Sequence, residues 1–167
     1  MLKKYIFLLA LSFLTATGKS QNLNWHLTAQ AGMADYRIEN FQGAFLAGFE
    51  TMEGQQLSIG PVFKNFSMNT HSETTIGGRI YSQTKVYDAL SLYIQCDVFA
   101  GVESNVVVSS KSPMRLETGA GLIYTYHDKI GLSAGYNLGE LNPISGVRKG
   151  TPSIKLIYIM PLGNNGW

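Results

Sequence analysis

The sequence predicts an all-β fold, an eight-stranded antiparallel up-and-down transmembrane β-barrel preceded by a signal peptide. Three observations predict it. Eight segments of the chain alternate apolar and polar residues with the two-residue period of a β-strand. The connections between these segments are alternately compact and longer, which is typical of hairpins that cross a membrane. A short apolar export segment precedes all eight.

The start of the chain has the three parts of a secretory signal. Two lysines open it, an apolar run follows over residues 5–14, and the small Gly18 and Ser20 suit the positions that a signal peptidase reads. A membrane-spanning helix would need about 20 apolar residues, and this run is shorter. We therefore expect a signal peptide over residues 1–20 and a single β-barrel domain over residues 21–167.

Loss of the signal changes the charge of the chain. Three of its 13 basic residues, Lys3, Lys4 and Lys19, leave with it, so 10 remain against 11 acidic residues. The mature net charge is then near −1, which argues against binding to nucleic acid. Cys96 is the only cysteine, so no intramolecular disulfide is possible, and we expect it to act as a small hydrophobic residue on an apolar face.

Four segments make up the first half of the predicted barrel. Residues 23–33 alternate without a fault, and residues 41–50 place phenylalanines on one face. Residues 55–66 alternate through Pro61, which cannot donate a ladder hydrogen bond, so we expect a bulge or a local break there. Residues 74–83 place isoleucines on one face and an arginine on the other.

The second half repeats the pattern. Residues 90–103 form the longest segment, with an aspartate among the polar set. In residues 114–126, leucine and tyrosine on one face alternate with charged residues and glycine on the other. In residues 129–138, apolar residues alternate with glycine and serine in the same way. Residues 153–162 are less regular, because two isoleucines share the polar face with Lys155.

The connections also indicate how the barrel is placed. The compact ones are 51–54, 84–89 and 127–128, and the longer ones are 34–40, 67–73, 104–113 and 139–152. Short turns on one side and long loops on the other are expected of a barrel that spans an outer membrane. An even number of strands then places both termini at the short-turn, periplasmic end and the longer loops outside.

Alternation alone does not decide which face points inward. A soluble lipocalin-like barrel hides its apolar face, whereas a membrane barrel exposes it. Glycine lies mostly on the polar face, where it would leave room for long polar side chains in a narrow lumen. Strand charges lie only on that face, and a Lys or Arg facing lipid at the midplane would cost about 2–4 kcal/mol. We therefore predict an internal polar network of Lys64, Arg79, Asp97, Arg115, Glu117 and Lys155.

Aromatic residues gather near the ends of the segments on the apolar face. Such rings favour the interface between lipid and water. The predicted aromatic girdle consists of Trp25, Phe41, Phe49, Phe63, Tyr124, Tyr126 and Tyr136.

With its eight alternating strands, matched turn lengths and export signal, the chain resembles the small outer-membrane barrels of the OmpA/OmpX type. The resemblance implies an outer-membrane location, contact with lipid and lipopolysaccharide, assembly by the barrel insertion machinery, and a monomer. Such barrels often end in an aromatic residue; Trp167 is aromatic, although residues 163–166, with Asn164, Asn165 and Gly166 among them, separate it from the last segment. The junction of Ser20 and Gln21 is similar to those in exported proteins of the Bacteroidetes.

Candidate chemistry is sparse. His71, Ser72 and Glu73 supply the residue types of a lipid A deacylase, but consecutive residues point apart and cannot form a relay by spacing alone. The histidines are too dispersed for a metal site, and no cofactor motif is present. We expect a non-enzymatic envelope protein with a structural or adhesive role through its outer loops and a plugged lumen. The alternatives are a small-solute channel, a lipid A-modifying enzyme and a soluble lipocalin-like carrier.

Overall fold

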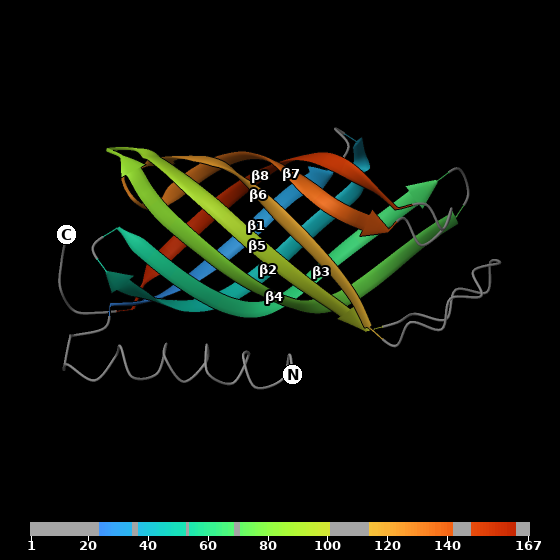
Figure 1. Cartoon of the computed structure of the whole chain (residues 1–167), viewed down its shortest axis with the longest axis horizontal. Helices are drawn as coiled ribbons and strands as arrows, with labels where there is room; N and C mark the ends of the chain where they lie inside the picture. Colours follow the sequence, from blue (N-terminus) through green and yellow to red (C-terminus); the bar gives the residue numbers. More distant parts are fainter. Residues whose placement is uncertain are drawn as a thin grey trace, which may run out of the picture.

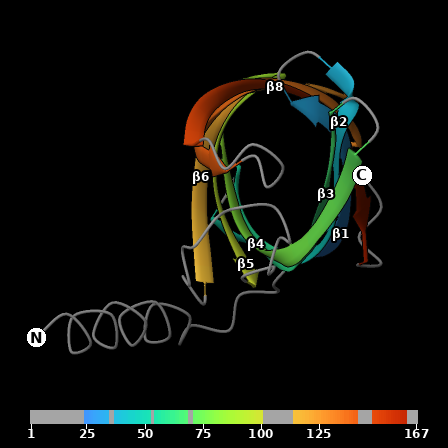
Figure 2. The same ribbon diagram turned by 90° about the vertical axis from the view of Figure 1, so that its right-hand side faces the viewer.

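The computed structural model describes residues 24–34, 37–52, 54–68, 71–100, 114–141 and 148–162. Its eight strands are β1 (Trp25–Ala34), β2 (Arg37–Met52), β3 (Gln55–Met68), β4 (His71–Tyr87), β5 (Leu90–Ala100), β6 (Met114–Tyr126), β7 (Ile130–Leu141) and β8 (Arg148–Pro161). Each strand pairs antiparallel with the next, and β1 pairs with β8, so the sheet closes on itself (Figures 1 and 2). The predicted eight-stranded up-and-down barrel is confirmed. Within the described ranges, no helix has the length and apolar character to cross a membrane. The predicted signal, residues 1–20, lies outside the described residues.

Five of the strands are longer than predicted, namely β2, β3, β4, β7 and β8. β2, β3 and β4 contain 16, 14 and 17 residues, whereas about 9–11 suffice to cross a bilayer. The predicted long connections 34–40 and 67–73 are therefore wrong, since only 35–36 and 69–70 lie between the strands. The part of the β3–β4 hairpin beyond the predicted bounds, residues 67–68 and 71–73, is called the β3–β4 extension. Polar side chains hold it together, because the hydroxyls of Ser72 and Thr74 both donate to Asn65 Oδ1, at 2.9 and 3.0 Å. In Figure 1 this hairpin reaches beyond its neighbours at the end opposite the short turns.

The remaining connections were predicted with mixed success. β4 continues to Tyr87, so residues 84–87 of the predicted connection are strand. The predicted loop over residues 139–152 is also shorter, because β7 continues to Leu141 and β8 begins at Arg148. Residues 101–113, which include the predicted loop 104–113, lie outside the described part of the chain.

The turn between β6 and β7 shows how the short connections are made. His127 and Asp128 have φ values of 49° and 53°, and Lys129 N donates to Tyr126 O at 3.2 Å. Two successive residues with positive φ are typical of a type I′ turn, whose twist matches that of the flanking strands. The compact connection predicted at this position is confirmed.

Pro61 causes the local break that its missing N–H predicts. It is paired with Gly78 on the β4 side. On the β2 side, pairing occurs at Ala44 and again at Ala47 but not between them, and the register is the same on both sides. The proline therefore removes ladder contacts without shifting the strand.

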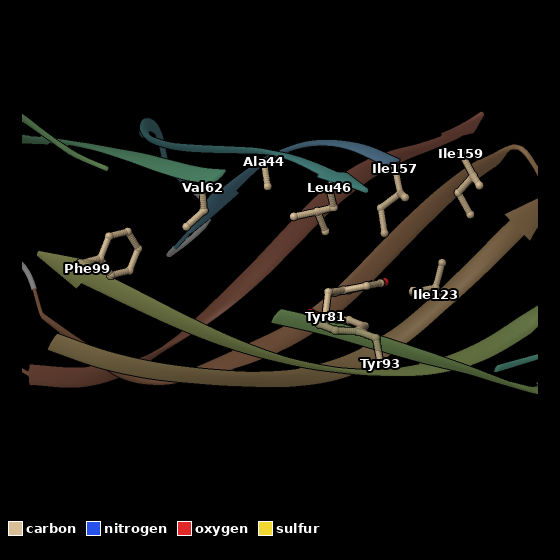
Figure 3. Packing of buried hydrophobic residues seen from close by; sticks show 9 residues of the cluster. All are labelled: Ala44, Leu46, Val62, Tyr81, Tyr93, Phe99, Ile123, Ile157 and Ile159. Carbon is tan, nitrogen blue, oxygen red and sulfur yellow. The ribbon is translucent and has the colours of Figure 1, made fainter. Parts of the chain in front are cut away.

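The polar face of the alternating pattern points into the barrel, as the glycine and charge positions predict. Lys64 is 2% exposed and Asp97 is 0% exposed, whereas Ile94, adjacent to the polar Gln95, is 66% exposed on the outer face. The interior is not purely polar. Nine buried apolar or aromatic side chains extend along it in Figure 3, namely Ala44, Leu46, Val62, Tyr81, Tyr93, Phe99, Ile123, Ile157 and Ile159.

Glycine makes room for the largest of these side chains. A Cβ atom added to Gly121 would lie 2.8 Å from the Tyr93 ring, and one added to Gly135 would meet the Tyr93 hydroxyl. Tyr93 stacks on Tyr81 with 5.6 Å between ring centroids. The close approach of the Tyr93 ring to the backbone of β6 and β7 thus requires residues without a side chain.

Candidate functional site: the barrel lumen

An arginine–aspartate pair lies in the middle of the lumen. The register places Arg79 of β4 opposite Asp97 of β5, and Asp97 opposite Glu117 of β6. Arg79 Nε donates to Asp97 Oδ1 at 2.7 Å, and Nη2 donates to Oδ2 at 2.8 Å. This two-point geometry matches a planar guanidinium to a carboxylate. The pair is thus positioned by strand register alone.

The other donors of Arg79 reach across the lumen to β1 and β2. Its Nη1 donates to Gln30 Oε1 at 2.6 Å, and its Nη2 lies 3.4 Å from Gln42 Oε1. Neither glutamine is among the predicted network residues, because only charged residues mark the network in the sequence pattern. Arg79 of β4 therefore connects the neighbouring strand β5 to β1 and β2 on the other side of the lumen.

Lys64 of β3 is surrounded by carboxylates from the far wall. Its Nζ lies 2.6 Å from Glu117 Oε2, 3.0 Å from Glu140 Oε1 and 3.6 Å from Asp97 Oδ2. All four side chains are at most 3% exposed. One ammonium group thus links β3 to β5, β6 and β7.

Glu140 is the network residue that the sequence pattern missed. It falls within the predicted 139–152 connection, but the structure places it in β7 and buries it. The register between β7 and β8 shifts between Asn137 and Glu140, and Gly139 has a φ of 70°. This bulge returns Glu140 to the inner face, where the hydroxyl of Thr151 donates to it. A glycine inside a strand pattern is the signal that would have pointed to the bulge.

Arg115 covers the network toward the end opposite the short turns. Its Nε lies 3.1 Å from Glu117 Oε1, and its guanidinium carbon lies 5.0 Å from the centroid of the Phe99 ring. Lys64 Nζ lies 5.3 Å from the same centroid. The ring thus contacts two cations, which adds a cation–π attraction to the ion pairs.

Lys155 joins the network through a neutral side chain. It donates to Gln95 Oε1, and its Nζ lies 3.4 Å from Tyr93 Oη and 4.6 Å from that ring's centroid. Gln95 Nε2 in turn lies 3.5 Å from Asp97 Oδ2 and 3.3 Å from Asn137 Oδ1. Of the six predicted residues, the structure brings five into one chain of ion pairs, and the sixth is connected through Gln95.

Among the described side chains, the candidate catalytic residues form no relay, since Ser72 donates to Asn65. The side chain of His71 lies outside the described part. His127 stacks edge-on against Tyr126 in a turn, with centroids 4.2 Å apart. Among the described residues, no group of three His, Cys, Asp or Glu side chains could hold a metal ion.

The predicted girdle residues lie near the two rims. Trp25 contacts Phe49 at 5.4 Å between centroids, and Phe41 contacts Phe63 at 5.8 Å. The register places the first pair near the short turns, with Tyr124 and Tyr126, and the second pair near the opposite end, with Tyr136.

The fold is shared with small outer-membrane barrels. No family model and no curated protein matches the chain. Among solved structures, the Yersinia pestis outer-membrane protein Ail in a phospholipid bilayer nanodisc is 15% identical, with a TM-score of 0.52, and the match covers 82% of this chain and 99% of that one. The N-terminal barrel domain of Pseudomonas aeruginosa OprF is 10% identical, with a TM-score of 0.49 and coverage of 84% and 98%. Neisserial surface protein A is 15% identical, with a TM-score of 0.43 and coverage of 83% and 97%. The resemblance stated from the sequence is thus confirmed at the level of the fold.

Proposed function

We propose that the chain is a non-enzymatic outer-membrane barrel whose lumen is closed by its own side chains, and that it serves envelope integrity or adhesion. One observation carries this proposal: the barrel is inverted relative to a soluble protein. Its buried set includes four cations and three carboxylates, and its exposed set is largely apolar. Such an apolar outer face favours contact with lipid over contact with water.

The size of the apolar outer face supports a location in lipid. Every strand contributes large apolar side chains to it, with Phe45 at 65%, Ile59 at 62% and Leu132 at 58% exposure. The largest apolar patch on a typical soluble monomer is only about 300–600 Å². A continuous band around a barrel would make the chain aggregate in water.

The lumen supports a structural role better than transport. Arg79 and Lys64 are nearly fully buried and reach across the lumen, and the buried Phe99 fills it toward the end opposite the short turns. An eight-stranded barrel normally has an interior that side chains fill. The same charges argue against a lipocalin-like carrier, which needs an apolar cavity.

An adhesive role would lie at the end opposite the short turns. The β3–β4 extension reaches out there, and the connections 101–113 and 142–147 join strands at that end. In the proposed orientation this end faces the outside of the cell, so any partner of the barrel would meet it first.

Two measurements test the proposal. We expect the mature chain to fractionate with the outer membrane and to migrate faster on a gel when unheated than when boiled. In planar bilayers we expect no steady conductance, because the lumen is closed. A monodisperse protein in detergent-free buffer would contradict the membrane location, and a stable open channel would contradict the plug.

A further inference from the structure

A cavity of about 400 Å³ opens at the short-turn end of the barrel. Gln83, Ser91 and Ile159 form its floor, since they line the cavity and are buried. Behind this floor Tyr81 donates to Gln83 Oε1 at 3.3 Å and stacks on Tyr93. Small-molecule sites usually have about 300–1,000 Å³. The cavity is therefore large enough for a small ligand and is closed toward the middle of the barrel.

Two buried side chains of the floor have hydrogen-bonding groups that the described structure leaves unused. Gln83 accepts from Tyr81 through Oε1, and its Nε2 donates to no described atom. The hydroxyl of Ser91 has no described partner either. Both residues face the inside of the barrel and are 6% and 4% exposed, so their remaining surface borders the cavity. Because buried polar groups are usually satisfied by protein, water or ligand, these two groups are available to a ligand.

The other polar groups near the floor are occupied or enclosed. His26 Nε2 lies 2.9 Å from Ser58 Oγ, and Glu50 accepts from Gly54 N at 2.9 Å. The hydroxyl of Thr125 has no partner in the described structure, but protein encloses it and no ligand in the cavity can reach it. The free groups of the floor are thus neutral, one amide and one hydroxyl.

The charged side chains of the cavity lie on its more exposed part. Asp88 and Asp128 are exposed and Glu50 is half-buried. Lys85, the one basic side chain with a fixed charge in the described lining, is half exposed and lies 4.0 Å from Asp128. Exposed ion pairs contribute little, because water and salt screen them. A charged ligand therefore gains little over a neutral one at this cavity.

The floor decides the class of ligand. A charged group placed there would be buried without a free opposite charge, which is costly. A purely apolar ligand would leave the Gln83 amide and the Ser91 hydroxyl unsatisfied. A ligand hydroxyl both donates and accepts, so it can pair with either group. Ile159 and Pro161 also line the cavity and can contact C–H groups of the ligand. Hydroxyl groups on a ring of C–H groups are the defining features of a sugar.

We propose that this cavity binds a neutral sugar of the size of a monosaccharide. The Gln83 amide donates to one hydroxyl oxygen of the sugar, and the Ser91 hydroxyl exchanges a hydrogen bond with a second. The C–H groups of the ring contact Ile159 and Pro161. This site goes beyond the role in the envelope proposed above and does not depend on it.

Four ring-shaped probes test the class of ligand. Glucose, glucosamine and glucuronate share one sugar ring but are neutral, cationic and anionic at slightly acidic pH, and cyclohexanol has a ring with a single hydroxyl. We expect the refolded chain, in a detergent without a sugar headgroup, to bind glucose saturably, observed by NMR shifts of the Gln83 and Ser91 amides. The other three probes should bind about threefold or more weakly, since each loses a hydroxyl pairing or brings a charge that the floor does not pair.

Matched serine variants locate the site. S91A should lower the affinity for glucose by about threefold to tenfold, which is the loss expected for one net hydrogen bond. Q83L should lower it by a similar factor. S82A removes the same hydroxyl from the outer face of β4, where Ser82 pairs with Ile94, and should change nothing. The proposal is overturned if glucose gives no saturable shifts, if another probe binds as tightly, or if S91A and S82A bind glucose equally well, whether or not Q83L folds.

Discussion

Lys64 on β3 and Glu117 on β6 contact each other through the centre of the barrel, with Nζ 2.6 Å from Oε2. The two strands are not neighbours in the sheet, so no backbone ladder joins them. The contact must therefore cross the lumen, and it ties opposite walls together. Both side chains are 2% exposed, which leaves little room for solvent to screen the pair.

Replacing Lys64 tests how much the contact across the lumen contributes to the stability of the barrel. K64M would leave three buried carboxylates without their shared cation, and removing one partner of a buried pair typically costs about 3–5 kcal/mol. We expect the free energy of unfolding to fall by that amount, measured by denaturant titration in detergent micelles. K155M is the matched control within the same lumen. Lys155 contacts neutral groups, so its loss should cost clearly less, and equal losses would refute the special role of Lys64.

The Arg79–Asp97 pair should behave as a unit. D97A leaves the buried Arg79 without its carboxylate partner, and R79A leaves Asp97 with Lys64, at 3.6 Å, as its remaining cation in the described structure, so each should lower the unfolding midpoint. In a double-mutant cycle the combined replacement should cost less than the sum of the two, with a coupling of about 0.5–3 kcal/mol. Unchanged midpoints for both single variants would show that the pair does not stabilise the barrel.

The glycines beneath Tyr93 should be intolerant of even a methyl group. G135A would force the added Cβ against the Tyr93 hydroxyl, and overpacking of this kind costs about 1–3 kcal/mol. G78A is the control, because a Cβ there meets nothing within 4 Å. Thermal unfolding followed by circular dichroism would compare the two. A G135A protein as stable as G78A would mean that the Tyr93 ring moves aside without cost.

A charged residue introduced on the outer face should destabilise the protein only where lipid surrounds that face. Ile94 lies mid-strand on that face, so I94R should destabilise the protein in bilayers by about 2–4 kcal/mol. S67R, on the β3–β4 extension, should have an effect within about 0.5 kcal/mol. Reversible unfolding from lipid vesicles measures both. If I94R is tolerated as well as S67R, the band does not face hydrocarbon.

Much of this architecture could be predicted because alternation is a local property. In a segment such as 114–126, the order of apolar and polar residues assigns each side chain to the inner or the outer face. In the structure, β6 has the same bounds as this segment. Strand extensions could not be predicted in the same way. Residues 37–40 and 71–73 lack regular apolar alternation, since outside the lipid a hairpin is held by its ladder and by polar contacts such as Asn65 with Thr74.

The sequence by itself determined the class of fold, the number of strands and which face carries the charges, because a two-residue period assigns every side chain to one of two sides. Only the tertiary structure decided which charges meet. Glu140 reaches Lys64 because the Gly139 bulge changes the register, and Gln30 and Gln42 reach Arg79 because closure of the sheet brings distant strands face to face. Contacts across a lumen depend on closure and shear, and no local pattern of residues encodes them.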